Sequence, residues 1–100
     1  MLNISKFSNE GALTIAVSGR LDANTAPQLE EELNTSLDGV TDLTFDFKGL
    51  DYVSSAGLRL LLSAQKHMAK QGKMRLISVC DAVMEVFDMT GFSDILTIDK

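Results

Sequence analysis

The sequence is poor in the residues that build disulfides, metal sites and catalytic triads. Its 100 residues include one cysteine, one histidine and no tryptophan. Cys80 alone cannot form an internal disulfide or a multi-cysteine metal site, so we expect it to be a packed small residue. His67, as the only histidine, argues against a transition-metal site. We therefore predict a protein without a cofactor or a metal.

Positive charge is also scarce. Lys and Arg number 9 against 14 Asp and Glu, which gives a formal net charge of −5. This excess would repel a phosphate backbone or an anionic membrane, so we expect no direct contact with nucleic acid and no membrane binding. The apolar stretches are short, and the amino terminus does not resemble a signal peptide. The sequence therefore predicts a cytoplasmic protein, and its length predicts one domain over residues 1–100.

Hydrophobic periodicity predicts strands that alternate with helices. Alternating apolar residues on both sides of the turn Asn9–Gly11 predict an amino-terminal hairpin. The later segments are predicted as a helix at 25–37, a strand at 43–47, a helix at 58–70, a strand at 74–79, a short helix at 81–90 and a strand at 95–98. Helices between the later strands favour parallel pairing. The predicted fold class is α/β, with helices packed on a mixed, mostly parallel sheet of about five strands and an antiparallel edge hairpin.

Several residues predict where these helices begin and end. Thr25 and Gln28 match a capping box, in which side chain and backbone satisfy each other's free donors. Pro27 is tolerated because it falls in the first turn. Asp81 is expected to cap the short helix, and Gly91 is expected to end it.

The segment Asp51–Leu58 joins a predicted strand to the long helix, and it contains the pair Ser54 and Ser55. The small residues Ala56 and Gly57 leave the two hydroxyls sterically open. A serine at this place can simply cap the helix, which contributes about 1 kcal/mol. A phosphate on Ser55 would also fit, because the free N–H groups and dipole of a helix amino terminus favour an anion by roughly 0.3–1 kcal/mol.

Catalysis by the serine pair is disfavoured. Ser55 and Gly57 give half of the G-x-S-x-G motif of serine hydrolases, but Val53 stands where the first glycine belongs. His67 lies further along the same predicted helix, about 18 Å from Ser55 at 1.5 Å per residue, so it cannot activate that hydroxyl. No P-loop lysine follows the segment, and no G-x-G-x-x-G occurs. We therefore predict that the protein is not an enzyme.

The run Ser54-Ser55-Ala56-Gly57-Leu58 resembles the phosphorylation motif of the STAS family of anti-sigma factor antagonists. The segments Ser18–Asp22 and Phe87–Phe92 resemble two further parts of that family, so the likeness spans the chain. The resemblance implies a STAS-type domain whose unmodified form binds an anti-sigma factor that is also a serine/threonine kinase, which releases a sigma factor. It also implies that phosphorylation abolishes this binding and that a metal-dependent serine phosphatase restores it.

The resemblance also assigns roles to residues. Ser55 matches the phosphorylated serine, and Ser54, where several family members carry Asp, is an alternative acceptor or a cap. The expected partner surface comprises Asp22, Ser54, Ala56, Gly57 and Arg59. Asp22 is alternatively a turn-stabilising residue.

Two alternatives stay open. Arg59, Ser63, Lys66 and Lys70 form a helical stripe that either meets an acidic partner or is a solvated face. The alternative function is a STAS scaffold or small-ligand sensor that is never phosphorylated, with both serines acting only as caps.

Overall fold

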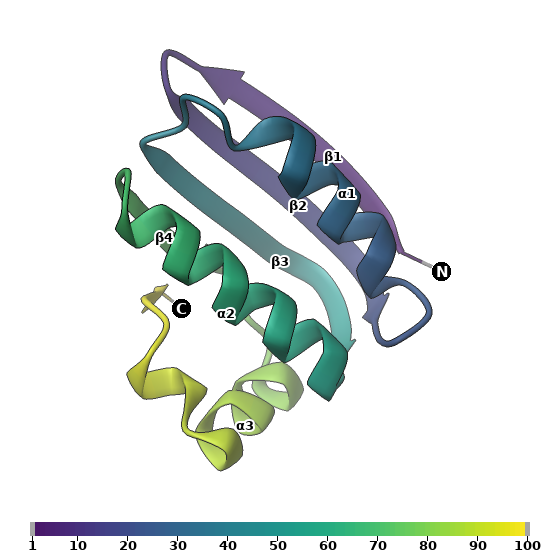
Figure 1. Cartoon of the computed structure of the whole chain (residues 1–100). Coiled ribbons are helices and arrows are strands. Elements are labelled where there is room, and N and C mark those ends of the chain that lie inside the picture. The colour runs from purple at the N-terminus through teal and green to yellow at the C-terminus, as the bar shows by residue number, and fades with distance from the viewer. Residues whose placement is uncertain (1, 100) are drawn as a thin grey trace.

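A five-stranded sheet organises the computed structural model, which describes residues 2–99 (Figure 1). The strands and helices follow in the predicted order, with one additional 3₁₀ helix. Their bounds are β1 Asn3–Asn9, β2 Ala12–Leu21, α1 Ala26–Ser36, β3 Asp42–Val53, α2 Ser55–Ala69, β4 Lys73–Ile77, α3 Asp81–Thr90, the 3₁₀ helix Phe92–Asp94 and β5 Ile98–Asp99.

The strands lie in the sheet in the same order as in the chain. β1 and β2 form an antiparallel hairpin, whose turn places Glu10 and Gly11 at φ 47° and 85°. The other pairings are parallel, because a helix carries the chain back before each new strand. The predicted α/β class, with a mixed, mostly parallel sheet and an antiparallel edge hairpin, is confirmed.

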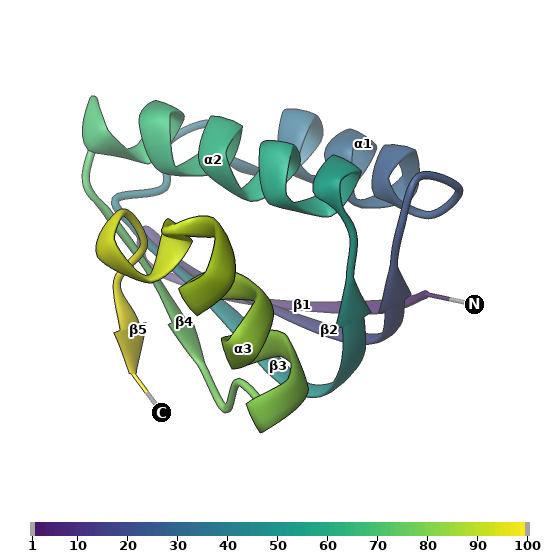
Figure 2. The same cartoon turned by 90° about the horizontal axis from the view of Figure 1, so that it is seen from below.

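Helices α1 and α2 lie side by side over one face of the sheet (Figures 1 and 2). The core fills the space between the two layers. Ile15 of β2, Phe45 and Phe47 of β3, and Leu29 of α1 are fully buried there, as is Leu61 of α2. Burying each such side chain contributes about 1.5–3 kcal/mol, so this layer holds both helices against the sheet.

The predicted capping box at α1 is wrong. Thr25 occupies the N-cap position, but its side chain makes no capping hydrogen bond. The hydroxyl instead donates to the carbonyl of Arg20 at 2.7 Å and accepts from the N–H of Asp22 at 2.9 Å. The Thr25 hydroxyl therefore forms its hydrogen bonds within the turn between β2 and α1, and not with the first N–H groups of α1 as the sequence pattern predicted. Pro27 does fall in the first turn.

Two predictions near the carboxyl end are also wrong. Cys80 rather than Asp81 occupies the N-cap of α3, and Asp81 lies within the first turn. A 3₁₀ helix takes part of the region after α3, so the strand predicted at Ile95–Ile98 begins only at Ile98. The end of α3 is as predicted, because Gly91 follows it with a left-handed φ of 80°.

Candidate functional site

The start of α2 is fixed to the ends of two parallel strands. β3 ends at Val53, and Ser54 is the N-cap of α2 with extended backbone. The N–H of Ser54 donates to the carbonyl of Leu21, the last residue of β2, at 2.9 Å, and the carbonyl of Ser54 accepts from the N–H of Leu58 at 2.9 Å. The serine pair therefore lies at the carboxyl edge of the sheet, where α/β folds commonly place binding sites.

The two serine hydroxyls have different environments. The Ser54 Oγ is buried and has no hydrogen-bond partner among residues 2–99. Ser54 occupies the N-cap position, but its side chain makes no capping hydrogen bond to α2, which contradicts the alternative that its hydroxyl caps this helix. Ser55, the first residue of α2, is exposed. Of the two hydroxyls, that of Ser55 is the one that another protein can reach.

Gly57 is required for close packing. It is buried, and a Cβ atom built on it would lie 2.8 Å from Cγ of Leu21 and 3.2 Å from the carbonyl oxygen of Leu21. Leu21 is itself fully buried and cannot easily move. The glycine thus lets α2 approach the end of β2 and helps to position Ser55. Its contact with a partner stays a prediction.

Asp22 organises the turn that follows β2. Its Oδ1 accepts hydrogen bonds from the N–H groups of Asn24 at 2.9 Å and Thr25 at 3.1 Å, and the Thr25 hydroxyl lies 3.2 Å away. Partial desolvation acts to raise the pKa of Asp22, but these hydrogen bonds and the nearby Arg20 charge outweigh it and hold the pKa below its ordinary value. The turn-stabilising interpretation is confirmed, and its partner contact stays a prediction.

Arg20 and Tyr52 form a pair that the sequence did not indicate. They are neighbours in the parallel register of β2 and β3. The guanidinium carbon of Arg20 lies 4.2 Å from the centre of the Tyr52 ring, and its Nε is 3.9 Å from Oδ2 of Asp22. Such a stack holds an exposed cation in place. Tyr52 lies within the segment singled out from the sequence, but only the strand register reveals its neighbour.

Ala56 and Arg59 of α2 line one hollow together with Ala23 and Pro27. Ala23 follows Asp22, so the predicted partner residues gather at one end of the molecule. Besides these mostly apolar residues, Glu30 of α1 lines the same hollow. The volume of this hollow is about 260 Å³.

The other predicted features are placed as follows. Cys80 is half-buried, with its Sγ 3.4 Å from the carbonyl oxygen of Leu50. Within residues 2–99, no group of three or more His, Cys, Asp or Glu side chains could hold a metal ion. None of the helices in this part of the chain is long and apolar enough to cross a membrane.

Known proteins share both the sequence pattern and the fold. A family model described as STAS domain matches residues 3–100. The anti-sigma-B factor antagonist of Bacillus subtilis (strain 168) is 30% identical over 98 residues, which cover 97% of this chain and 90% of that protein.

Two solved structures have the same fold. The anti-sigma factor antagonist SpoIIAA in its unphosphorylated form gives a TM-score of 0.81 at 20% identity, covering 100% of this chain and 89% of that one. The Bacillus cell fate determinant SpoIIAA in the phosphorylated form gives 0.73 at 19% identity, covering 100% and 92%. With the family model matching almost every residue and a relative at 30% identity, this chain belongs to the STAS family of anti-sigma factor antagonists.

Proposed function

We propose that this protein is an anti-sigma factor antagonist that is switched by phosphorylation of Ser55. In its unmodified form it binds an anti-sigma factor that is also a serine/threonine kinase, and a sigma factor is released. Phosphorylation of Ser55 abolishes this binding, and a metal-dependent serine phosphatase restores it. The observation that carries the proposal is the exposed hydroxyl of Ser55 at the first position of α2, beside the buried hydroxyl of Ser54.

The position of Ser55 suits a phosphate. α2 is 15 residues long and has no acidic residue in its first turn, so its amino-terminal N–H groups face no competing side-chain anion there. A helix amino terminus favours a negative charge by roughly 0.3–1 kcal/mol. The modified protein is therefore expected to keep its fold, in agreement with the phosphorylated relative of the same fold.

A phosphate would still change the surface strongly. It adds about −1.5 to −2 charges and three acceptor oxygens to a neutral side chain. A clash of like charge at an interface costs several kcal/mol, and each 1.4 kcal/mol is about tenfold in affinity. One phosphate can thus remove a partner without a change in the fold.

The remaining assignments follow from this role. The protein acts as a substrate and a regulator with no catalysis of its own, in the cytoplasm, as one domain over residues 1–100. The partner surface comprises Asp22, Ala56 and Arg59, together with the Ser54 backbone and the α2 turn at Gly57. The shared hollow of Ala56 and Arg59 beside the Asp22 turn supports this grouping.

Partner capture tests the proposal. Tagged Ser55→Ala should retain the kinase partner in cells of the source organism, because it cannot be modified, whereas Ser55→Asp should lose it. Ser54→Ala is the matched control and should behave as the wild type, because its hydroxyl is buried. Equal capture of the kinase by Ser55→Ala and Ser55→Asp would contradict the proposal.

A further inference from the structure

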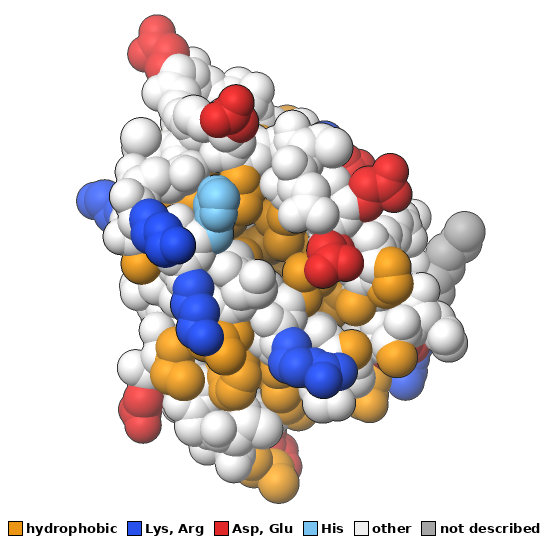
Figure 3. All heavy atoms as spheres, viewed as in Figure 1, with side chains coloured by type: hydrophobic (Ala, Val, Ile, Leu, Met, Phe, Trp, Pro, Cys, Tyr) orange, Lys and Arg blue, Asp and Glu red, His pale blue; other side chains and the backbone are white. Residues whose placement is uncertain are grey.

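Charges of opposite sign are separated on the two helices that cover the sheet. α1 contains Glu30, Glu31 and Glu32 and no Lys or Arg. α2 contains Arg59 and Lys66 and no Asp or Glu. The basic row continues at Lys70, the first residue after α2, and the acidic row at Asp38, two residues after the end of α1. Figure 3 shows the two rows as parallel lines of blue and red side chains on the same face of the molecule.

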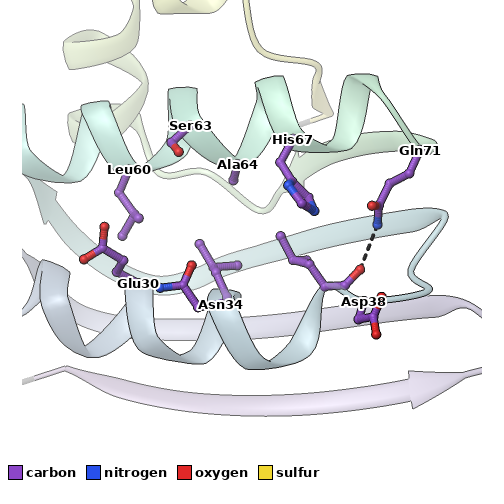
Figure 4. Close-up of a pocket in the computed structure, with 10 residues that line it drawn as sticks. Glu30, Asn34, Asp38, Leu60, Ser63, Ala64, His67 and Gln71 are labelled. Carbon is purple, nitrogen blue, oxygen red and sulfur yellow. Dashed lines mark hydrogen bonds between the residues drawn. The ribbon is translucent and has the colours of Figure 1, made fainter.

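A groove separates the two rows. Its floor is apolar and is formed by Leu33, Leu37, Leu60 and Ala64, and its volume is about 270 Å³. Glu30, Asn34 and Asp38 form the α1 wall, and Ser63, His67 and Gln71 form the α2 wall at the same four-residue spacing (Figure 4). The imidazole of His67 points into the groove towards α1. A hydrogen bond joins the two walls at one end, where Gln71 Nε2 donates to the carbonyl of Leu37 at 2.7 Å.

The two rows do not neutralise each other within the molecule. In the part of the chain from 2 to 99, no ion pair joins α1 to α2. The one α1 carboxylate in an ion pair is that of Glu32, which lies 2.7 Å from Nζ of Lys6 on β1. Glu30, Arg59 and Lys66 are all exposed. Both rows are therefore available to a surface with the reverse arrangement of charge.

This chain itself has that reverse arrangement. We propose that the α1–α2 face is a self-association surface, on which the acidic α1 of each copy lies against the basic α2 of the other. A two-fold axis along the groove exchanges α1 and α2 between the copies, so the same contact forms twice. A two-fold axis across the groove would place α1 on α1, acidic on acidic, and is excluded by repulsion.

Charged residues of α1 and α2 lie at matching positions along the groove, so this rotation brings opposite charges together without a shift along the groove. Glu30 shares its hollow with Arg59 and Ser63, and Asp38 shares the groove with His67. After the rotation, Glu30 of each copy therefore faces Arg59 of the other copy, and Asp38 faces His67 and Lys70. The contacts of Glu30 with Arg59 and of Asp38 with Lys70 are exposed ion pairs, so the association is weak and depends on concentration.

The net charge of −5 on each copy opposes the contact, but it acts over a longer distance. The molecule is 20 Å across its shortest axis, whereas the screening length is about 10 Å at 0.1 M salt. Repulsion between whole molecules is thus already reduced at this salt, while the attraction of ion pairs in contact is not reduced.

The hollow of Ala56 and Arg59 lies on the same face, so self-association competes with a partner that binds beside Ser55.

Sedimentation velocity of the full chain tests the proposal. The wild type should associate reversibly at 0.1 M salt, and its association constant should fall about tenfold at 1 M salt, where the screening length is about 3 Å. Glu30→Lys with Asp38→Lys places lysines opposite Arg59 and Lys70 of the other copy, and Arg59→Glu with Lys70→Glu places glutamates opposite Glu30 and Asp38, so each double variant should be monomeric. An equimolar mixture of the two should associate again as a heterodimer.

Matched controls carry the same changes in net charge at other exposed positions. These are Glu85→Lys with Asp88→Lys on α3, and Lys48→Glu with Lys73→Glu on the sheet, and both should associate as the wild type does. The proposal would be overturned if the wild type stayed monomeric at all concentrations up to about 1 mM. At about this concentration a complex with a binding free energy of about −4 kcal/mol is half formed. The proposal would also be overturned by an equimolar mixture of the two charge-reversed variants that does not associate. None of these results depends on phosphorylation of Ser55.

Discussion

At the scale of single residues, Ser54 and Ser55 are distinguished by burial. Both are small, polar and placed at the start of α2, so their order along the chain does not show which hydroxyl is accessible. The extended backbone of Ser54 directs its Oγ inwards, where it has no hydrogen-bond partner among the described residues, and leaves Ser55 exposed. The side-chain direction depends on the angle between β3 and α2, which tertiary packing sets.

We predict that Ser54→Ala keeps or raises the stability of the protein. A buried hydroxyl without a partner costs free energy, and its removal relieves that cost. A helix-capping serine would instead lose about 1 kcal/mol on the same change. Urea denaturation of the wild type and the variant measures the difference. A loss of that size in Ser54→Ala would show that its hydroxyl caps α2 in solution.

The pKa of the Asp22 carboxyl should lie below 3.8, the ordinary value for an aspartate side chain. Because the folded-state pKa is lowered, the contribution of Asp22 to stability is present above the unfolded value and is lost as the pH falls through the folded value. Side-chain carboxyl shifts in an NMR pH titration report this pKa directly. Thr25→Val removes one hydrogen-bond donor and should move the pKa upwards, while an Asp22 pKa at or above 3.8 in the wild type would contradict the observed hydrogen bonds.

At the scale of elements, apolar periodicity predicted the order of strands and helices correctly, because burial of one face dominates their stability. The helix ends were harder to predict. Thr25 and Asp81 both match capping patterns, yet the β2–α1 turn engages the first and Cys80 takes the place of the second. The 3₁₀ helix beyond Gly91 shortens β5 in a region where the apolar pattern predicted a strand.

The amino terminus of α2 should tolerate a negative charge better than a positive one. Ser55→Asp is expected to keep or raise the free energy of unfolding, and Ser55→Lys to lower it, with a difference of roughly 0.6–2 kcal/mol between them at low salt. Chemical denaturation of both variants measures this difference, which should shrink in 1 M salt because the screening length falls to about 3 Å. Equal stability of the two variants at low salt would show that the helix end does not favour an anion.

At the scale of the whole molecule, the parallel sheet brings distant segments to one edge. The turn at Asp22 and the start of α2 are separated in sequence, but the bond from the Ser54 N–H to the Leu21 carbonyl joins them. The family resemblance supplied these residues as candidates for one surface, and the structure gives their placement. The Arg20–Tyr52 stack and the opposed charges of α1 and α2 could not be predicted from the sequence, because they depend on strand register and helix direction, which only the structure shows.

We propose that Ser55 is the single acceptor of a regulatory phosphate. Intact mass after incubation with ATP and each serine/threonine kinase of the source cell that resembles an anti-sigma factor tests it most directly. We expect one added phosphate on the wild type and on Ser54→Ala, and none on Ser55→Ala. A phosphate on Ser55→Ala, or no phosphate on the wild type with any of these kinases, would contradict it.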